Sequence, residues 1–126
     1  MTQRTWTDEE LAVYRATARR RREQDRDAEK ARREKAWAAA RLAAGILKNR
    51  YHASRVVVFG SLAQKGARFT RWSDVDIAAW GLKERDWLRA LGTLLDLDVG
   101  FQVNMVDVTT CTPELLATIE QDGVEI

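Results

Sequence analysis

The chain has 126 residues, 45% of them hydrophobic, which is enough for one domain with one modest core. Its net charge is only +2, but residues 1–55 carry 15 Lys or Arg against 8 Asp or Glu, whereas residues 56–126 carry 6 against 11. The single cysteine, Cys111, excludes an intrachain disulfide, and no apolar run resembles a signal peptide or a membrane span. We therefore expect a cytoplasmic protein with a basic arm on an acidic body.

The first part of the chain is predicted to be a long basic helix. Thr7 and Glu10 have the spacing of a capping box, which marks a helix N-terminus. Good helix formers dominate the chain after this box, so one helix of about 40 residues is expected, with residues 23–27 as its weakest part. Residues 19–34 are almost wholly polar and cannot bury themselves in a core. We interpret residues 1–50 as an arm, either a solvated helix or a docking surface for an acidic partner or RNA.

The end of this helix is more apolar than its middle. Trp37, Ala40, Ala44 and Leu47 recur at helical spacing. We expect this part to pack on the domain formed by residues 51–126.

The rest of the chain alternates between strand and helix patterns. Apolar runs predict strands over residues 55–59, 74–80 and 101–106, helical spacing predicts core helices over residues 86–95 and 113–122, and residues 124–126 are expected to add an edge strand. The first two strands are joined by a loop, not by a crossover helix. We therefore predict an α+β fold, a small mixed β-sheet with helices packed on it, preceded by a long N-terminal helix.

Two acidic residues in the second predicted strand indicate a metal site. Asp74 and Asp76 are two positions apart, so their side chains point to the same face of a strand. Two carboxylates in a core repel each other, and a divalent cation would relieve that repulsion. Mg²⁺ prefers oxygen ligands and shares them with substrate phosphates. Asp74 and Asp76 are therefore predicted to be catalytic metal ligands in a two-ion scheme.

A phosphate-binding segment is expected before this pair. Gly60 has no side chain, so its backbone can approach a phosphate, and Ser61 supplies a hydroxyl and an N–H at a strand end. Lys65, Arg68 and Arg71 lie further along the chain and can neutralise phosphate charge. We predict that these five residues bind a nucleotide.

The pattern Gly60-Ser61, a twelve-residue spacer and Ser73-Asp74-Val75-Asp76 resembles the DNA polymerase β nucleotidyltransferase superfamily. More narrowly, it is similar to the minimal nucleotidyltransferases (MNT) of prokaryotes, the partners of HEPN-domain proteins. The likeness runs from about Val56 to Ile126, a little over half of the chain. It implies the nucleotidyltransferase fold, Mg²⁺, ATP as substrate, and Ser73 as a further nucleotide-binding residue.

One position departs from the family pattern. The family has a third carboxylate on a following strand, and by the flanking residues that place is Asn104, a poorer Mg²⁺ ligand that cannot act as a base. Asp107 would point to the opposite face of an unbroken strand, and Asp98 would lie about 20 Å away at 3.3 Å per residue. Either Asp74 and Asp76 still hold the metal and transfer is impaired, or Asn104 is an engineered substitution in an active enzyme.

The resemblance implies the antitoxin of a HEPN/MNT pair, in a hetero-oligomer with its toxin. It would transfer AMP from ATP to a tyrosine of the HEPN toxin, a ribonuclease, and this adenylylation (AMPylation) would repel and block RNA. One alternative is a non-catalytic antitoxin that acts by direct binding. Another is an aminoglycoside-type small-molecule nucleotidyltransferase, which generally needs further structure to hold its acceptor. No membrane partner is expected and, without a template-binding domain, no direct nucleic-acid substrate.

Overall fold

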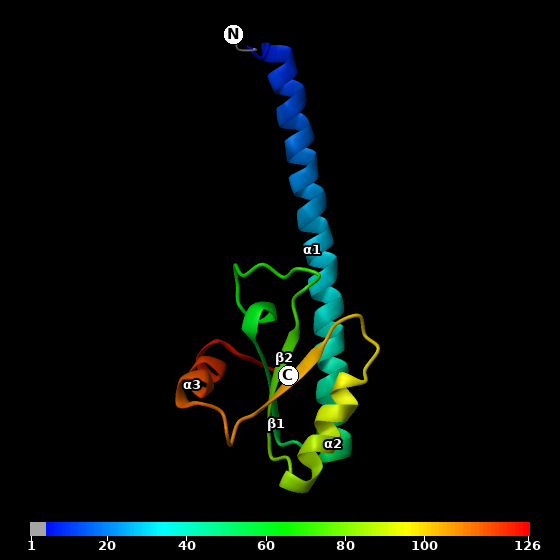
Figure 1. The fold of residues 1–126 in the computed structure, drawn as a ribbon, viewed down its shortest axis with the longest axis vertical. Helices are drawn as coiled ribbons and strands as arrows, with labels where there is room; N and C mark the ends of the chain where they lie inside the picture. The colour runs from blue at the N-terminus through cyan, green and yellow to red at the C-terminus, as the bar shows by residue number, and fades with distance from the viewer. Residues whose placement is uncertain (1–4) are drawn as a thin grey trace.

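A computed structural model of the chain describes residues 5–126 and consists of one long helix and a small body (Figure 1). The helix, α1, spans Asp8–Tyr51, and its beginning lies far from the body. In chain order the body contains β1 (Arg55–Phe59), the 3-10 turn η1 (Gly60–Leu62), β2 (Val75–Trp80), α2 (Glu84–Leu95), β3 (Val103–Asp107), α3 (Pro113–Asp122) and β4 (Val124–Glu125). The predicted order of elements is confirmed, with boundaries that shift by one or two residues.

The four strands form one mixed sheet in the order β3-β2-β1-β4. β1 pairs antiparallel with β2 and β4, whereas β2 and β3 run parallel. This pattern follows from the connections, because a loop joins β1 to β2 and the helix α2 carries the chain from β2 to β3. The predicted α+β fold with a mixed sheet is therefore confirmed.

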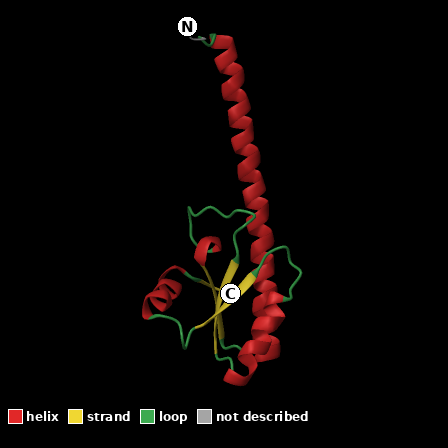
Figure 2. Cartoon of the chain, viewed as in Figure 1, coloured by secondary structure: helices red, strands yellow, loops and turns green. Residues whose placement is uncertain are grey.

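Helices cover both faces of the sheet (Figures 1 and 2). α1 and α2 pack on one face and α3 on the other. The buried residues of β1 alternate between the two layers, since Val56 and Val58 belong to the larger core under α1 whereas Val57 belongs with Ile119 of α3 to the smaller one. A strand buried on both faces explains the continuous apolar run in the sequence.

α1 is both arm and core element. Its N-terminus is capped as predicted, because the hydroxyl of Thr7 accepts from the backbone N–H of Glu10 at 3.1 Å. The helix continues without a break through residues 23–27 and ends at Tyr51. The next residue, His52, caps it in the left-handed conformation with φ 59°. Its buried residues all lie in the last third of the helix, and most are alanines: Ala36, Ala39, Ala40, Ala43, Ala44, Leu47 and Tyr51. Small side chains let the helix axis lie close to the sheet.

Two predicted core positions are wrong. In α2, Leu88 is 77% exposed, although it was expected among the core leucines, because the packed stripe of the helix runs through Ala90 and Leu94. Leu95 at the end of the same helix is 49% exposed. Both side chains lie beside the buried stripe, where helical spacing alone does not separate a core position from a flanking one.

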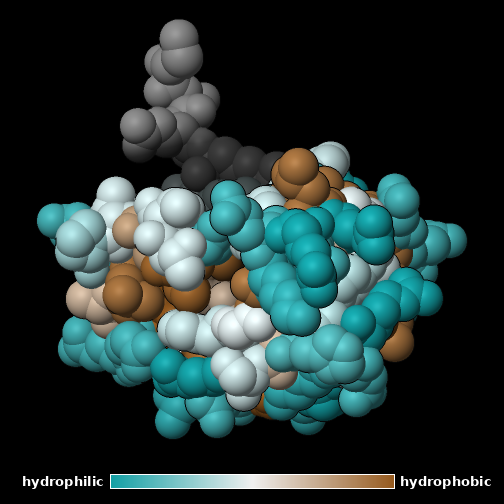
Figure 3. All heavy atoms as spheres, turned by 90° about the horizontal axis from the view of Figure 1, so that it is seen from below, coloured by the Kyte–Doolittle hydropathy of each residue, from teal (hydrophilic) through white to brown (hydrophobic). Residues whose placement is uncertain are grey.

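The face of the body opposite the arm is mostly hydrophilic (Figure 3). Figure 3, which views the molecule from the end opposite the arm, shows hydrophobic side chains gathered mainly on the side that carries α3 in Figure 1. Among residues 5–126, no helix is long and apolar enough to cross a membrane.

The alanine packing of α1 can be tested by adding volume. We expect Ala40→Leu to lower the free energy of unfolding by about 1–3 kcal/mol, because Ala40 is fully buried and three added carbons must displace the sheet. Ala38→Leu is the matched control, since Ala38 is exposed on the same helix, and it should stay within about 0.5 kcal/mol. Urea denaturation followed by circular dichroism measures both, and equal effects would contradict the close packing.

Candidate functional site

Three polar side chains converge where β2 begins. Asp74 immediately precedes β2, Asp76 lies within it, and Asn104 of β3 is the register partner of Asp76. The side-chain amide of Asn104 donates to Oδ2 of Asp74 and to Oδ1 of Asp76, at 3.3 Å each. All three side chains are half-buried. The parallel pairing of β2 and β3 therefore brings together residues that are about 30 positions apart in the chain.

Gly60 closes this site from the neighbouring strand. β1 ends at Phe59, which is paired with Asp76, and the chain turns at Gly60 with φ +75°, in the left-handed region. A Cβ atom at Gly60 would lie 2.6 Å from Oδ2 of Asp76. Only glycine fits here, because any side chain would meet both the strained backbone and the carboxylate. Ser61 follows Gly60 in the same turn.

The electrostatics of the site depend on Asp76. Burial raises the pKa of its carboxyl group above the usual value, and the charge of Asp74 raises it further, whereas the hydrogen bond from Asn104 lowers it. Within residues 5–126, no group of three or more His, Cys, Asp or Glu side chains could hold a metal ion. The neutral amide of Asn104 is therefore what partly relieves the repulsion between the two carboxylates.

Gln102 is a fourth member that sequence reasoning missed. Its side-chain amide donates to Oδ1 of Asn104 at 2.9 Å. Because that bond occupies the oxygen of Asn104, the NH₂ group of Asn104 is turned toward the two carboxylates. A signal was present in the sequence, since Gln102 and Asn104 are two positions apart and so share a face if the strand continues.

The donor set fits one divalent cation better than two. The carboxylates of Asp74 and Asp76 are suitable Mg²⁺ ligands and leave positions for phosphate oxygens. The same oxygen atoms accept from Asn104, so a cation has to displace that amide. No other acid completes the set: Asp107 pairs with Ala79, three positions further along β2 than Asp76, and its carboxylate accepts from Thr109.

The loop between η1 and β2 is held against α1. The backbone N–H of Phe69 donates to Oε1 of Glu29 at 2.7 Å, and Arg32 donates to the carbonyl of Phe69 at 3.0 Å. Arg33 donates to the carbonyls of Leu62 and Ala67. The bond from Phe69 also lowers the pKa of Glu29. Residues 19–34 were predicted to be too polar to bury themselves in the domain. That prediction is wrong for Glu29, Arg32 and Arg33, which are partly buried because the backbone N–H and carbonyl groups of the loop give their side chains hydrogen-bond partners.

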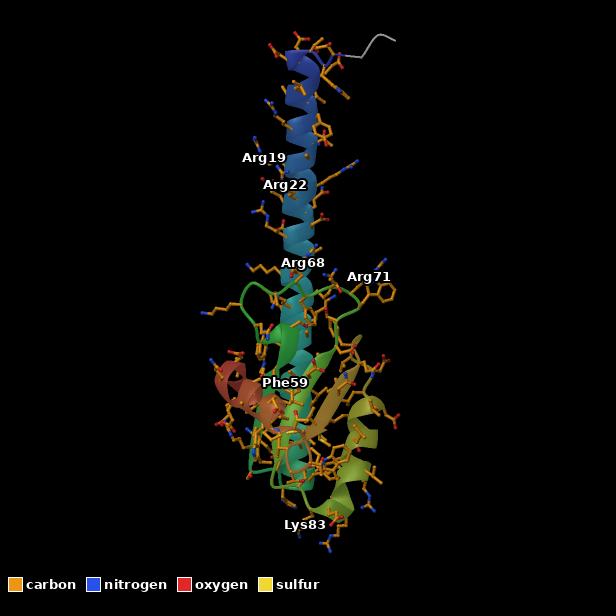
Figure 4. All side chains as sticks on the ribbon, turned by 60° about the vertical axis from the view of Figure 1, so that its left-hand side comes forward. Arg19, Arg22, Phe59, Arg68, Arg71 and Lys83 are labelled. Carbon is orange, nitrogen blue, oxygen red and sulfur yellow. The ribbon has the colours of Figure 1, made fainter. Side chains whose placement is uncertain are left out.

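The predicted phosphate-binding cations lie on this loop and are not bonded to the carboxylates. Lys65, Arg68 and Arg71 are exposed and line grooves between the loop and α1, and none of them has a hydrogen bond or ion pair with Asp74 or Asp76. Figure 4 shows Arg68 and Arg71 beside α1. Ser73 is engaged in the loop itself, since its hydroxyl accepts from the backbone N–H of Thr70 at 2.9 Å. A role of these four residues in nucleotide binding stays a prediction.

Comparison with known proteins bears on the fold. No family model matches the chain, and no curated protein matches it. A crystal structure of the toxin-antitoxin MntA-HpeT mutant, with two aspartate-to-glutamate changes two positions apart, superposes with a TM-score of 0.51. The match covers 69% of this chain and 70% of that chain at 18% sequence identity. The match shows that the two chains share a fold.

Two matched substitutions separate the effect of the close contact between Gly60 and Asp76 from the effect of backbone strain. Gly60 and Gly66 both have positive φ, but a Cβ atom at Gly66 would meet nothing within 4 Å. Gly60→Ala should therefore lower the free energy of unfolding by about 1–3 kcal/mol more than Gly66→Ala, since both introduce strain and only one meets a carboxylate. Thermal and urea unfolding measure the difference, and its absence would show that Asp76 moves aside freely.

The raised pKa of Asp76 predicts a pH dependence of stability. The folded chain holds the Asp76 proton more tightly than the unfolded chain does, so the stabilisation present below pH about 3.9 is lost as pH rises through the folded pKa. Asp76→Asn removes this loss. In buffer without divalent cations, the free energy of unfolding of Asp76→Asn relative to the unsubstituted protein should increase from pH 3.5 to 7. A flat or falling difference would contradict the burial of the Asp76 charge.

Proposed function

We propose that this protein is the antitoxin of a HEPN/MNT toxin-antitoxin pair and a Mg²⁺-dependent nucleotidyltransferase. In this proposal it transfers AMP from ATP to a tyrosine of the HEPN toxin. The observation that carries it is the convergence of Asp74 and Asp76 beside the Gly60 turn. The fold shared with a toxin-antitoxin structure supports the same conclusion.

The residues of the site have distinct roles in this reaction. Asp74 and Asp76 would hold Mg²⁺, which when bound supplies positive charge for the triphosphate. Gly60 lets the carboxylate of Asp76 lie against the turn, and Ser61 would offer a hydroxyl and an N–H as donors to a phosphate. These groups position the α-phosphate for in-line attack by a tyrosine oxygen, and pyrophosphate leaves as the new O–P bond forms.

Asn104 limits the rate of this transfer. An amide cannot accept the proton of the attacking tyrosine, so the proton passes to water. The amide also competes with a cation for the oxygens of Asp74 and Asp76. Transfer is therefore expected to be slow in this chain, although the geometry for binding a nucleotide is retained.

A partner protein has an apolar surface available at the far end of α1. Trp6, Val13 and Tyr14 are 50%, 68% and 64% exposed, and the rings of Trp6 and Tyr14 lie 6.4 Å apart. Aromatic side chains of this kind form the centres of protein interfaces. We place the toxin contact at this end of the arm.

A second candidate function is inhibition by direct binding without transfer. It is favoured by the hydrogen bonds of Asn104, which allow the two carboxylates to coexist without a cation. In that case the long arm would neutralise the toxin by contact alone.

Restoring a carboxylate at position 104 tests the proposal. Asn104→Asp should raise AMP transfer to a HEPN partner by about a hundredfold, the lower end of what a positioned general base contributes. Each transfer adds about 329 Da, the mass of an AMP group, to the partner in intact-mass spectrometry with ATP and Mg²⁺. Asp76→Asn is the matched negative control and should abolish the addition.

Two outcomes would contradict this assignment. No mass addition by either the unsubstituted protein or Asn104→Asp, with partner activity still inhibited at stoichiometric protein, would establish the binding function instead. No gain for Asn104→Asp while calorimetry still detects ATP binding would show that position 104 is not the site of the missing base.

A further inference from the structure

A groove lined by arginines runs between α1 and the loop that leads to β2. Its walls carry Arg22, Arg26 and Arg32 from the helix, and Arg68, Arg71 and Trp72 from the loop. We call this the arginine groove. Figure 4 shows Arg22 higher along the arm than Arg68 and Arg71. Residues far apart in the sequence thus form one basic surface.

The positive charge of the arginine groove is largely uncompensated. Two acids line it, Asp25 and Glu29, against five arginines. Glu29 is already engaged with the backbone of Phe69 and with Arg33. Among residues 5–126, no acid lies within ion-pair distance of Arg22, Arg26, Arg68 or Arg71. Such a surface gathers counterions, and a polyanion that binds there releases them.

The charge continues from the groove along the arm in a regular row. Arg15, Arg19, Arg22 and Arg26 are spaced by four, three and four residues, so they lie on one stripe of α1. The eleven steps from Arg15 to Arg26 rise about 16 Å along the helix axis. A linear array of this length suits several successive charges of an extended polymer better than one compact anion.

The exposed indole ring of Trp72 lies at the edge of the arginine groove. Trp72 is 80% exposed, and the guanidinium of Arg71 lies 4.9 Å from the centre of its ring. A free tryptophan face beside arginines is the arrangement on which bases of single-stranded nucleic acids stack. Phe69, the other large apolar residue of the lining, is only 1% exposed and cannot serve this purpose.

We propose that the arginine groove binds single-stranded RNA, with the phosphates along Arg22, Arg26, Arg68 and Arg71 and one base stacked on Trp72. An acidic protein fits less well, because a protein interface needs an apolar centre and the groove exposes only one large apolar side chain. The RNA is a ligand of the groove and need not be an acceptor for the carboxylate site. The proposal does not depend on AMP transfer.

Fluorescence anisotropy with a 5′-labelled twelve-nucleotide oligouridine tests it, in buffer without ATP or divalent cations. Arg22→Ala/Arg26→Ala should weaken binding and reduce the slope of log K against log salt by about 1.4, which is 0.7 for each lost phosphate contact. Trp72→Ala should weaken binding about tenfold, and Trp72→Phe should retain most of it. Arg85→Ala/Arg89→Ala on α2 is the control of equal charge, since both residues are exposed outside the groove.

The outcomes separate the proposal from its alternatives. Selective loss in the groove variants, with the α2 control unchanged and all variants folded by circular dichroism, supports it. Equal loss in the α2 control would show binding by overall charge and overturn it. Absence of RNA binding at 50 mM salt, or displacement of the RNA by a poly-glutamate peptide at lower concentration than by unlabelled oligouridine, would overturn it in favour of an empty or protein-binding surface.

Discussion

Repulsion between two carboxylates at the start of β2 is the constraint around which the rest of the site is arranged. Asp74 and Asp76 face the same side, and burial makes the charge of Asp76 more costly still. The repulsion is partly relieved by a neutral donor, the side-chain amide of Asn104, which donates to both carboxylates. Gln102 orients this amide by donating to its oxygen. A carboxylate at position 104 would add a third negative charge, and the site would then depend on a cation for its stability. With the amide of Asn104 in place, the site can fold without a bound cation.

The same constraint determines what surrounds the site. Because β1 ends opposite Asp76, the chain must turn away there without a side chain, which is why a glycine with positive φ occupies position 60. The loop after this turn returns along α1, and Glu29, Arg32 and Arg33 hold its backbone. α1 is therefore part of the site's framework. A partner that bends or displaces the helix would also move the loop that carries Arg68 and Arg71.

Much of this organisation could be predicted from the sequence because it is encoded locally. The threonine caps of α1 and α3, the apolar runs of the strands and the spacing of Asp74 and Asp76 each depend on residues a few positions apart. The placement of Asn104 required the family resemblance, and the parallel register of β2 and β3 now pairs it with Asp76. Contacts that depend on tertiary packing were missed. Nothing in a polar helical run distinguishes Glu29 or Arg33, which hold a loop, from neighbours that face solvent.

The exposure of Leu88 was missed for a related reason. Helical periodicity defines a stripe, but the width of the stripe that is buried depends on how closely the helix approaches its neighbours. α1 meets the sheet through alanines, so it lies close and buries a narrow band, and Leu42 on the same helix is 51% exposed. α2 likewise buries Ala90 and Leu94 and leaves Leu88 outside. The exposure of these leucines therefore depends on the size of the residues at the helix contacts more than on the hydrophobicity of the leucines themselves.

Asn104 bears differently on the two candidate functions. Contact with a partner through α1 needs no cation, because the surface of the arm does not change when the amide of Asn104 moves. Transfer requires the cation to take the oxygens of Asp74 and Asp76 from that amide, and the energy for this exchange must come from binding the nucleotide phosphates as well as the ion. Transfer would therefore respond steeply to Mg²⁺ and ATP, whereas neutralisation by contact would not. Under the proposed function, such a chain would hold its partner at all times and modify it only when the nucleotide site is filled.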